Sequence, residues 1–577
     1  MRFLLVALNT KYIHSNPAVY SLRGYLSEEL REHVDIAEYT INNSLSEIMA
    51  GIYEKKPDVI GLSCYIWNIS MMLELVKELP KILPNVPIFL GGPEVTYRAK
   101  ELMESYPQLS GIMIGEGEET FAELLHYYLT KEGALSEIKG LQLTCGFTGD
   151  RPLTDINTLP FLYDNLDDFE NKIIYYESSR GCPFRCSYCL SSIDKTVRLR
   201  NIDIVKKELD YFLAHNVKQV KFVDRTFNCN KEHAMEIWRY ILEHDNGVTN
   251  FHFEVSADLL TLEEIALLNK MRPGLAQLEI GVQSTNPMTI EAIRRSMNLE
   301  KLAANVAAVN KGENVHQHLD LIAGLPHEDY ASFANSFNEV YAMKPEQLQL
   351  GFLKVLAGSY MHEMAAKYGI VYMDKPPYEV LYTRWLSYED VMRLKRIEEM
   401  VEMYYNSNQF VHTICLLEKA FTSPFSMYEA LADFFEEKGY FLLNPARSYR
   451  YQVLLDFACS VDGANEETYR ELLTFDLYLR EKAKSRPTFA PAKEEDRDFV
   501  REFYIKEAEK RSFLPSYEGY DSKQLLKMTH LESFSYPVWE KDGAKLLQKL
   551  ESPAYILFDY KQRSPLTGDA QITVIDA

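Results

Sequence analysis

The stretch ESSRGCPFRCSYC, residues 177–189, places Cys182, Cys186 and Cys189 within eight positions of a 577-residue chain that holds eight cysteines. Thiolates at this spacing, in a loop that follows a strand, suit an iron–sulfur cluster or zinc. No second cysteine pair follows, because Cys229 stands alone about forty residues further on. Three protein ligands leave one coordination position open for a substrate or cofactor. The alternatives are cysteines buried in a core, or a zinc knuckle completed by a distant histidine.

The segment around this motif alternates strand-like apolar runs with helix-like segments. The six runs fall at residues 172–179, 217–224, 250–258, 276–284, 316–326 and 346–355. Six βα units are too few to close an eightfold barrel, so we predict a partial (β/α)6 barrel over residues 169–360, with its site at the C-terminal ends of the strands. Polar residues stand at four of these ends, namely Asp224, Glu254, Gln283 and Asp320.

The first part of the chain, residues 1–135, shows the same alternation. Its five strand-like runs lie at residues 2–9, 34–41, 58–68, 87–95 and 111–119. This pattern predicts an α/β domain with a doubly wound parallel sheet. In such a sheet ligands bind beyond the carboxyl ends of the strands, where glycine lets a bulky ligand approach the backbone. The small and polar residues at these ends are Ser63, Cys64, Gly91, Gly92, Gly115, Glu116 and Gly117.

The rest of the chain contains a connector and a different third part. Residues 136–168 carry prolines and polar residues without a sustained period, so we expect a linker there. Residues 361–577 change to helical periods, for example at 388–407 and 426–440. Two β-rich runs around a Pro/Gly turn then predict a C-terminal hairpin. We expect a mostly helical domain without a catalytic motif of its own, which could cap the barrel and shape the substrate site.

Composition limits the class of protein. The formal net charge is −22, which opposes a broad grip on nucleic acid. The longest apolar runs are far too short to cross a bilayer, and the run at the N-terminus ends before it reaches signal-peptide length. The five cysteines outside the triplet are scattered singly, which fits a reducing compartment. We therefore expect a cytoplasmic protein that uses neither a membrane nor nucleic acid.

The motif GCPFRCSYC after the first strand of a six-unit barrel resembles that of the radical S-adenosylmethionine (SAM) enzymes. In that family three cysteines hold a [4Fe–4S] cluster, and the fourth iron is chelated by the amino and carboxylate groups of SAM. An electron from the cluster then cleaves SAM to a 5′-deoxyadenosyl radical. The resemblance thus explains the missing fourth cysteine. It also implies an external electron donor of the flavodoxin or ferredoxin type.

The same resemblance implies a set of SAM contacts. Tyr188 would lie by the adenine, and FVDRTFN at residues 222–228 matches the second-strand motif near the methionine amino group, with Asp224-Arg225 in place of a glycine pair. Glu254 and Arg295 match contacts of coproporphyrinogen-oxidase-like members, Arg295 with the methionine carboxylate. The remaining matches are Gln283 and Asp320 at the ribose and Gly324 at the adenine. The alternatives are solvated strand-end carboxylates for Glu254 and Asp320, and a surface ion pair for Arg295.

A doubly wound, flavodoxin-like domain ahead of such a barrel resembles the cobalamin-binding branch of the family. The resemblance implies that the strand ends given above hold cobalamin. The signature D-x-H-x-x-G is absent; Tyr12-x-His14-x-x-Pro17 keeps only the histidine. His14 is then either a cobalt ligand or a hydrogen-bonding loop residue. Cys64 and Trp67 are candidates for the corrin face, although a buried cysteine is usually a small hydrophobic residue.

The function implied is that of a cobalamin-dependent radical SAM enzyme, with a [4Fe–4S] cluster, SAM and cobalamin as cofactors. We expect a methyltransferase acting on an unactivated carbon of a small-molecule or peptide substrate. A non-methylating rearrangement or cyclisation is the first alternative. A B12 or redox sensor is the second. The cofactors carry the chemistry in each case, so the protein has to position them.

Overall fold

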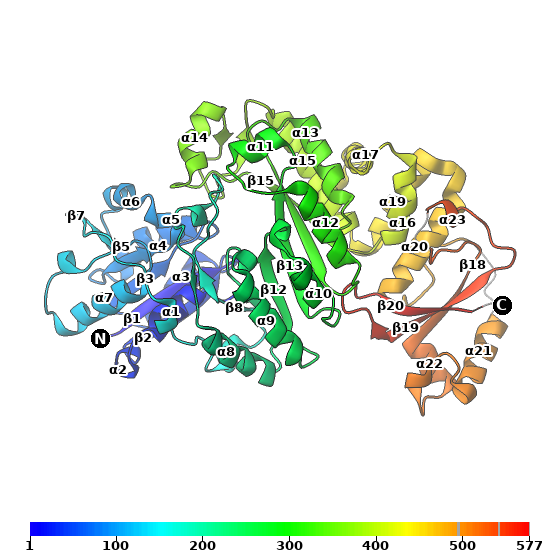
Figure 1. The fold of residues 1–577 in the computed structure, drawn as a ribbon, viewed down its shortest axis with the longest axis horizontal. Helices are drawn as coiled ribbons and strands as arrows, with labels where there is room; N and C mark the ends of the chain where they lie inside the picture. The colour runs from blue at the N-terminus through cyan, green and yellow to red at the C-terminus, as the bar shows by residue number, and fades with distance from the viewer. Residues whose placement is uncertain (493–496, 541–542, 576–577) are drawn as a thin grey trace.

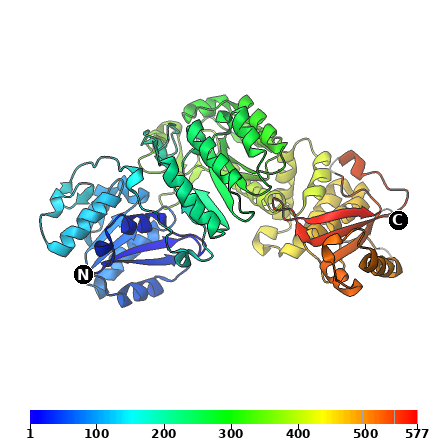
Figure 2. The ribbon, with the colours of Figure 1, turned by 60° about the horizontal axis from the view of Figure 1, so that its bottom comes forward.

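The computed structural model describes residues 1–492, 497–540 and 543–575; the remaining positions of the expected C-terminal domain lie outside the described residues. Three parts follow one another along the long axis of the molecule (Figure 1). The N-terminal α/β part lies at one end, the barrel in the middle and the C-terminal part at the other end, and Figure 2 shows the same order after rotation.

The N-terminal part is built on a seven-stranded sheet with the order β2-β1-β3-β4-β5-β6-β7. Its first five strands are parallel and follow the flavodoxin-like order 2-1-3-4-5, as expected. β6 and β7 are antiparallel and come from residues 136–168, so part of the expected linker extends this sheet. The strands are β1 (Phe3–Asn9), β2 (Val34–Thr40), β3 (Val59–Ser63), β4 (Ile88–Gly91), β5 (Leu109–Met113), β6 (Leu141–Leu143) and β7 (Gly146–Phe147).

Helices cover both faces of this sheet because its strands are apolar on both sides. One face packs under α3, α4 and α6, and the other under α1 and α7. The helices are α1 (Pro17–Gly24), α2 (Glu28–Arg31), α3 (Leu45–Glu54), α4 (Ile69–Ile82), α5 (Pro93–Thr96), α6 (Ala99–Ser105) and α7 (Glu118–Thr130).

The middle part is an open barrel of six parallel strands in the order β15-β14-β13-β12-β11-β8. This confirms the expected partial barrel. Its strands are β8 (Ile174–Tyr176), β11 (Gln219–Phe222), β12 (Asn250–Val255), β13 (Ala276–Gln283), β14 (His316–Ala323) and β15 (Gln347–Phe352). Its helices are α8 (Ile202–Ala214), α9 (Lys231–Glu243), α10 (Leu262–Leu268), α11 (Pro287–Ala292), α12 (Leu299–Asn310) and α13 (Tyr330–Tyr341).

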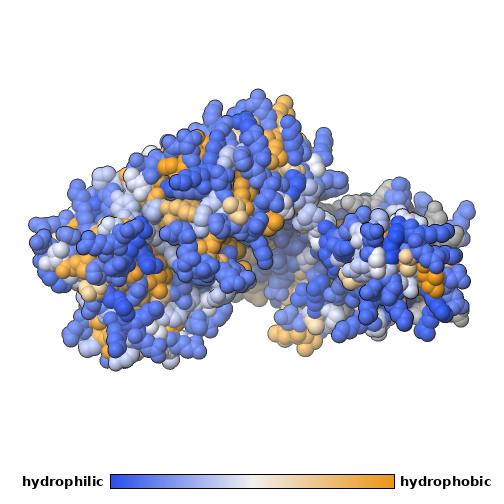
Figure 3. Space-filling view, turned by 90° about the horizontal axis from the view of Figure 1, so that it is seen from below, coloured by the Kyte–Doolittle hydropathy of each residue, from blue (hydrophilic) through white to orange (hydrophobic). Residues whose placement is uncertain are grey.

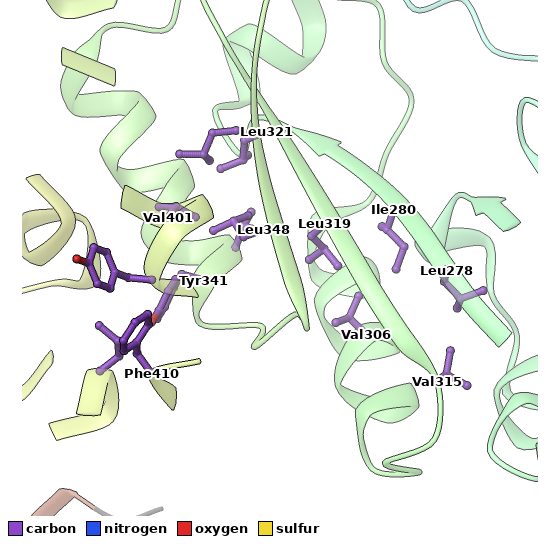
Figure 4. Packing of buried hydrophobic residues seen from close by; sticks show 14 of the residues in the cluster. Leu278, Ile280, Val306, Val315, Leu319, Leu321, Tyr341, Leu348, Val401 and Phe410 are labelled. Atoms are coloured by element: carbon purple, nitrogen blue, oxygen red, sulfur yellow. The ribbon is translucent and has the colours of Figure 1, made fainter. Parts of the chain in front are cut away.

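The two faces of the barrel sheet differ in polarity because side chains alternate along a strand. In β13 and β14 every second residue is fully buried under the helices, as Figure 4 shows for Leu278, Ile280 and Leu319. The other residues face the inside and are mostly polar, among them Glu279 and His318. A barrel interior built only for stability is filled by bulky apolar residues. The polar interior therefore points to ligand binding.

The C-terminal part packs against the last barrel strand. A helix α15 (Tyr388–Val401) continues into a π-helical turn η7 (Glu402–Asn406), and both contact β15. The Asn406 side chain accepts a hydrogen bond from the backbone N–H of Leu348 (2.9 Å) and donates one to its carbonyl (3.0 Å). Asn406 thus occupies the free edge of β15 as a neighbouring strand would.

One hydrophobic core joins the barrel to this C-terminal part. Its buried members run from Tyr163 to Ala570, and Figure 4 shows the junction, where Tyr341 and Leu348 of the barrel lie near Val401 and Phe410. Further elements are α14 (Tyr360–Tyr368), β16 (Val371–Tyr372), β17 (Val380–Tyr382), α16 (Val411–Leu417), α17 (Pro424–Glu437), α18 (Tyr440–Leu443), α19 (Arg447–Asp462), α20 (Glu466–Arg480), α21 (Arg497–Lys510), α22 (Ser522–Met528) and α23 (Gly543–Leu546). The expected hairpin is β19 (Ala554–Arg563) with β20 (Ala570–Ile575), and β18 (Thr529–Phe534) adds a third antiparallel strand.

Polar contacts also join the N-terminal part to the barrel. Lys172, just before β8, lies 2.6 Å from Glu38 of β2. Glu116, after β5, pairs with Arg198 at 2.5 Å. The Tyr378 hydroxyl donates to Glu94 of α5, so the segment after the barrel reaches the N-terminal part as well. These contacts hold the carboxyl ends of the two parallel sheets toward a shared space.

The face seen in Figure 3 is mostly hydrophilic, with apolar residues in scattered groups. Among the described residues, no helix has both the length and the apolar character needed to cross a membrane.

Candidate functional site

The cysteine loop lies at the carboxyl end of β8. Cys182 and Cys186 are buried and Cys189 is partly exposed, and all three are free thiols. The loop is held by its neighbours, since the Ser187 N–H donates to the Ile293 carbonyl at 2.8 Å and the Met361 N–H donates to the Ser187 carbonyl at 2.7 Å. The three thiols therefore have fixed positions at the mouth of the barrel.

These thiols fit a [4Fe–4S] cluster. No group of three His, Cys, Asp or Glu residues in the described part of the chain converges on a single metal ion. A cluster needs no such convergence, because each cysteine binds a different iron. Arg295 approaches Cys186 at 3.6 Å and the Tyr188 hydroxyl at 3.3 Å. A guanidinium at this distance stabilises the negative charge of a cluster thiolate.

Arg295 and Gln283 also have buried polar atoms without a hydrogen-bond partner among the described residues, namely Nε and Oε1. Gln283 adopts a positive φ of 73° at the end of β13, a conformation that costs free energy outside glycine. Buried polar groups are nearly always satisfied. The two side chains thus fit a site for a polar ligand, as expected for SAM.

Asp224 has hydrogen-bond partners within the protein. Its carboxylate is buried and accepts hydrogen bonds from the Ser178 N–H (3.0 Å) and from the hydroxyls of Ser178 (2.7 Å) and Ser179 (2.6 Å). Burial raises the pKa of Asp224 to about 6 in spite of these bonds. The structure therefore places it as a brace for the segment that leads into the cysteine loop, and a SAM contact stays a prediction.

Glu254 and Asp320 both lie on the inner face of the barrel. Burial raises the pKa of Glu254 to about 7 and that of Asp320 to about 8, and for each the neighbouring carboxylate of Glu279 adds to the rise. His318 lies 3.3 Å from Asp320. Gly324 follows β14 next to Val380 of β17. Glu254, Asp320 and Gly324 thus lie in one region above the barrel interior, and the carboxylate of Asp224 is close enough to add to the raised pKa of Glu254.

A cavity of about 560 Å³ separates the N-terminal sheet from the barrel. Its lining comes from the carboxyl ends of the strands on both sides. Of the residues expected at cobalamin, it includes Ser63, Gly91, Gly92, Gly115, Glu116 and Gly117. Gly115 has a φ of +81° and open space where a Cβ would stand, so the backbone is free for a ligand there. These turns fit a bulky ligand such as cobalamin.

Three of the expected cobalamin residues have other contacts. Cys64 is fully buried in the core of the N-terminal part, on the side away from the cavity. Both Glu116 oxygens are occupied, because Arg198 and the Thr154 N–H donate to them. The His14 Nδ1 lies 2.5 Å from the hydroxyl of Tyr175 on β8, which agrees with the hydrogen-bonding alternative. Cobalamin contacts of these residues stay predictions.

Two side chains of the site escaped the sequence reasoning. Tyr65 stacks on Trp67 with ring centroids 4.5 Å apart and lines the cavity. The Thr226 hydroxyl lies 3.7 Å from the Cys182 sulfur. Thr226 lies within FVDRTFN, but neither residue stands out in the sequence, because a strand-end tyrosine or threonine is common in any α/β protein.

Comparison with known families agrees with this architecture. A B12 binding domain matches residues 4–125, and the radical SAM superfamily matches residues 176–340. The chain thus contains a B12 binding domain followed by a radical SAM domain, and the cofactors expected from these domains are the [4Fe–4S] cluster, SAM and cobalamin. A third match, a protein family of unknown function (DUF4080), covers residues 366–558 and defines the C-terminal part.

Two curated relatives show the extent of the similarity. The cobalamin-dependent radical SAM methyltransferase TokK of Streptomyces tokunonensis is 28% identical over 58% of this chain and 53% of its own length. An uncharacterised methyltransferase of Pyrococcus horikoshii is 24% identical over 74% of this chain and 92% of its own length. The chain spans about half the length of the first of them.

A solved structure agrees in fold. The cobalamin-dependent SAM radical enzyme OxsB, with aqua-cobalamin and SAM bound, matches with a TM-score of 0.56 and 17% identity, over 82% of this chain and 78% of its own. At this identity the match shows the fold alone. The predicted fold class, a doubly wound domain followed by a partial radical SAM barrel and a helical C-terminal part, is confirmed.

Proposed function

We propose that this protein is a cobalamin-dependent radical SAM methyltransferase acting on an unactivated carbon. The observation that carries the proposal is the shared cavity, into which the glycine turns of the B12 binding domain and the first two strands of the radical SAM barrel both open. When bound, the cluster with SAM supplies the 5′-deoxyadenosyl radical, and cobalamin supplies the methyl group. Relatives named as methyltransferases support this reading.

The residues of this chain have four tasks in that function. Cys182, Cys186 and Cys189 would each hold one iron, and Arg295 would stabilise their charge. Gln283 and the inner-face carboxylates would orient SAM. The turns at Gly92 and Gly115 would admit cobalamin. Packing of the two sheets around one cavity would exclude water from the reacting groups, which limits side reactions.

The remaining expectations belong to this proposal. An external donor of the flavodoxin or ferredoxin type would reduce the cluster, and the substrate would be a small molecule or a peptide. The C-terminal part covers the edge of β15 rather than forming an isolated unit. It would shape the barrel wall from that side.

Anaerobic reconstitution tests the proposal. We expect iron, sulfide and absorbance to indicate a [4Fe–4S] cluster and hydroxocobalamin to bind, with SAM cleaved to 5′-deoxyadenosine under dithionite. Replacing all three loop cysteines by alanine should abolish the cluster and SAM cleavage while cobalamin binding persists. Cleavage that survives this replacement would contradict the proposal. The product separates the alternatives, because methylation adds about 14 mass units and cyclisation does not.

A further inference from the structure

The charged side chains that line the cavity between the B12 binding domain and the barrel almost all form ion pairs. Within the described residues, each carboxylate of the lining lies within 4 Å of an arginine. The pairs are Glu116, Glu118 and Glu177 with Arg180, Asp194 with Arg198, and Glu208 with Arg200. Such pairing is what buried charges require.

Arg225 is the exception, and unlike the buried carboxylates Glu118 and Glu208 it is exposed. It lines the same cavity, and its guanidinium forms no ion pair or hydrogen bond with any residue of the described ranges 1–492, 497–540 and 543–575. It follows Asp224, whose carboxylate is held by Ser178 and Ser179. The backbone that carries Arg225 is therefore fixed, while its charged group is free.

The position of Arg225 lies between the two expected cofactor sites. Burial raises the pKa of Tyr65 on the B12 side, and the Arg225 guanidinium opposes that rise, so the two groups are within electrostatic range. The Arg225 guanidinium also opposes the rise in the pKa of Glu254, which faces the SAM region. A substrate that receives a methyl group from cobalamin and loses a hydrogen atom to the SAM-derived radical has to lie between these two sides.

We infer that Arg225 binds an oxyanion, a carboxylate or a phosphate, of the substrate. This inference rests on the proposed function for the position of the substrate. A guanidinium presents a planar fork of donors that matches the two oxygens of a carboxylate or phosphate. Among the described residues, Arg225 is the guanidinium of the lining that these carboxylates do not engage, so it is available to an anionic group of the substrate. The substrate class is a polar molecule with an acidic group, not a neutral hydrocarbon.

Two cofactors also carry oxyanions, so the source has to be distinguished. The resemblance assigns the methionine carboxylate of SAM to Arg295, which lies by Cys186. Cobalamin carries a phosphate on its nucleotide tail, which the glycine turns of the N-terminal part are expected to hold. Arg225 lies on the barrel side of the cavity, after β11. The shared chemistry is oxyanion binding, and the test separates the three sources.

The test uses trifluoroacetate as a carboxylate probe. Holoenzyme that contains the cluster and cob(II)alamin is mixed with SAM and trifluoroacetate, and the paramagnetic cobalt broadens the fluorine resonance of probe bound nearby. We expect broadening with the wild type, and about tenfold weaker probe binding in Arg225→Met, which loses a charge-assisted hydrogen bond. Arg225→Lys keeps the charge and should keep most of the broadening. Arg185→Met, an exposed arginine outside the cavity lining, is the matched control.

The outcomes are separable. The inference stands if Arg225→Met loses probe binding while its affinities for SAM and hydroxocobalamin stay within about twofold of the wild type, since neither cofactor then uses this guanidinium. Loss of SAM affinity would assign the oxyanion to SAM, and loss of hydroxocobalamin affinity to its phosphate; either overturns the inference. The inference is also overturned if the fluorine resonance of the probe does not broaden with the wild type, or if it broadens equally with Arg225→Met. If the wild type forms no 5′-deoxyadenosine with dithionite, the proposed function is contradicted. Probe binding at Arg225 is measured without SAM cleavage, so its result does not depend on that outcome.

Discussion

Glu328 is a buried carboxylate on the loop after β14. The hydroxyls of Ser284 and Ser336 donate to its Oε1, at 2.6 and 2.9 Å, and its Oε2 has no partner among the described residues. Burial raises the pKa of Glu328 to about 7. The pKa of a glutamate in an unfolded chain is about 4.3. As pH rises between these two values the unfolded chain loses its proton first, so the free energy of unfolding falls.

Glu328→Gln should remove this pH dependence. The amide keeps the acceptor for both serines and cannot ionise. Relative to the wild type, the variant should gain stability as pH rises from 5 to 8, by on the order of 1–3 kcal/mol. Urea unfolding at the two pH values measures the effect. Glu300→Gln, at an exposed position of α12, is the control. A constant difference between Glu328→Gln and the wild type across this range would contradict the assignment.

The hydrogen bonds of Asp224 hold the segment before the cysteines in place, and replacing Asp224 tests this role. Asp224→Asn keeps an acceptor for the two serine hydroxyls at Oδ1, but it loses the hydrogen bond from the Ser178 N–H at Oδ2 and turns an amide NH2 toward that donor. The free energy of unfolding should fall by about 1–3 kcal/mol, and iron bound per chain should decrease after reconstitution. Ser179→Ala removes a single donor and should have a smaller effect on both measurements. Full iron content together with lost SAM affinity would instead favour a direct SAM contact.

Among elements, the π-helical turn η7 replaces a strand at the open edge of the barrel. Asn406→Leu removes both hydrogen bonds to Leu348 and leaves its backbone groups without partners beside an apolar side chain. We expect a loss of about 1–3 kcal/mol in the free energy of unfolding, measured by urea denaturation. Exposed strand edges also pair with other chains, so light scattering should increase with protein concentration.

Ser407→Ala is the matched control for that variant. The Ser407 hydroxyl donates to the Met403 carbonyl within the same turn and does not contact β15. If Ser407→Ala and Asn406→Leu destabilise the protein equally, the effect comes from the helix and not from the strand edge.

Sequence patterns identify the strands more completely than the connections between them. Apolar runs predict β1 to β5 and the six barrel strands within a few residues, because parallel strands are buried on at least one face. β6 and β7 are short, and Gly146 interrupts their pattern, so the sequence suggests a linker where the sheet continues. The antiparallel strand β18 is missed as well, because its sequence THLESF has only two apolar residues. The local pattern of apolar residues does not show which short segment will pair with the edge strand of a sheet.

At the scale of the molecule, Glu116 joins the B12 binding domain to the barrel through Arg198 and Arg180. Burial acts to raise its pKa, but the arginines and the Thr154 N–H lower it to about 2. Its stabilising effect is thus complete above the pKa of an unfolded glutamate and is lost as pH falls toward 2. At neutral pH the carboxylate is fully charged, so the ion pairs between the two parts are intact.

Glu116→Gln should loosen this interface. At neutral pH, limited proteolysis within residues 148–168 should become several times faster, because a partly buried ion pair loses one charge. Glu78→Gln, which loses an ion pair with Lys81 within α4 of the same domain, is the control. Weaker cobalamin binding with unchanged proteolysis would show that Glu116 contacts the cofactor, as the sequence predicts.

The cysteine loop is the part of the site that sequence predicts best, since its spacing leaves few chemical alternatives. Cys64 shows the limit at a strand end: Ser63 lines the cavity and its neighbour points into the core, and only the register of β3 decides between them. Arg225 shows another limit. The sequence marks it as a departure from the familiar motif, but its lack of a partner depends on the positions of all the surrounding ion pairs.

The hydrophobic core shared by the barrel and the C-terminal helices has a consequence for protein engineering. A protein shortened to residues 1–360 would lose the residues that cover Leu348 and Tyr341, and with them part of its own barrel wall. The region of unknown function therefore cannot be exchanged between relatives as an interchangeable module. Chimeras with new substrate specificity would have to replace β15, α13 and the C-terminal helices together.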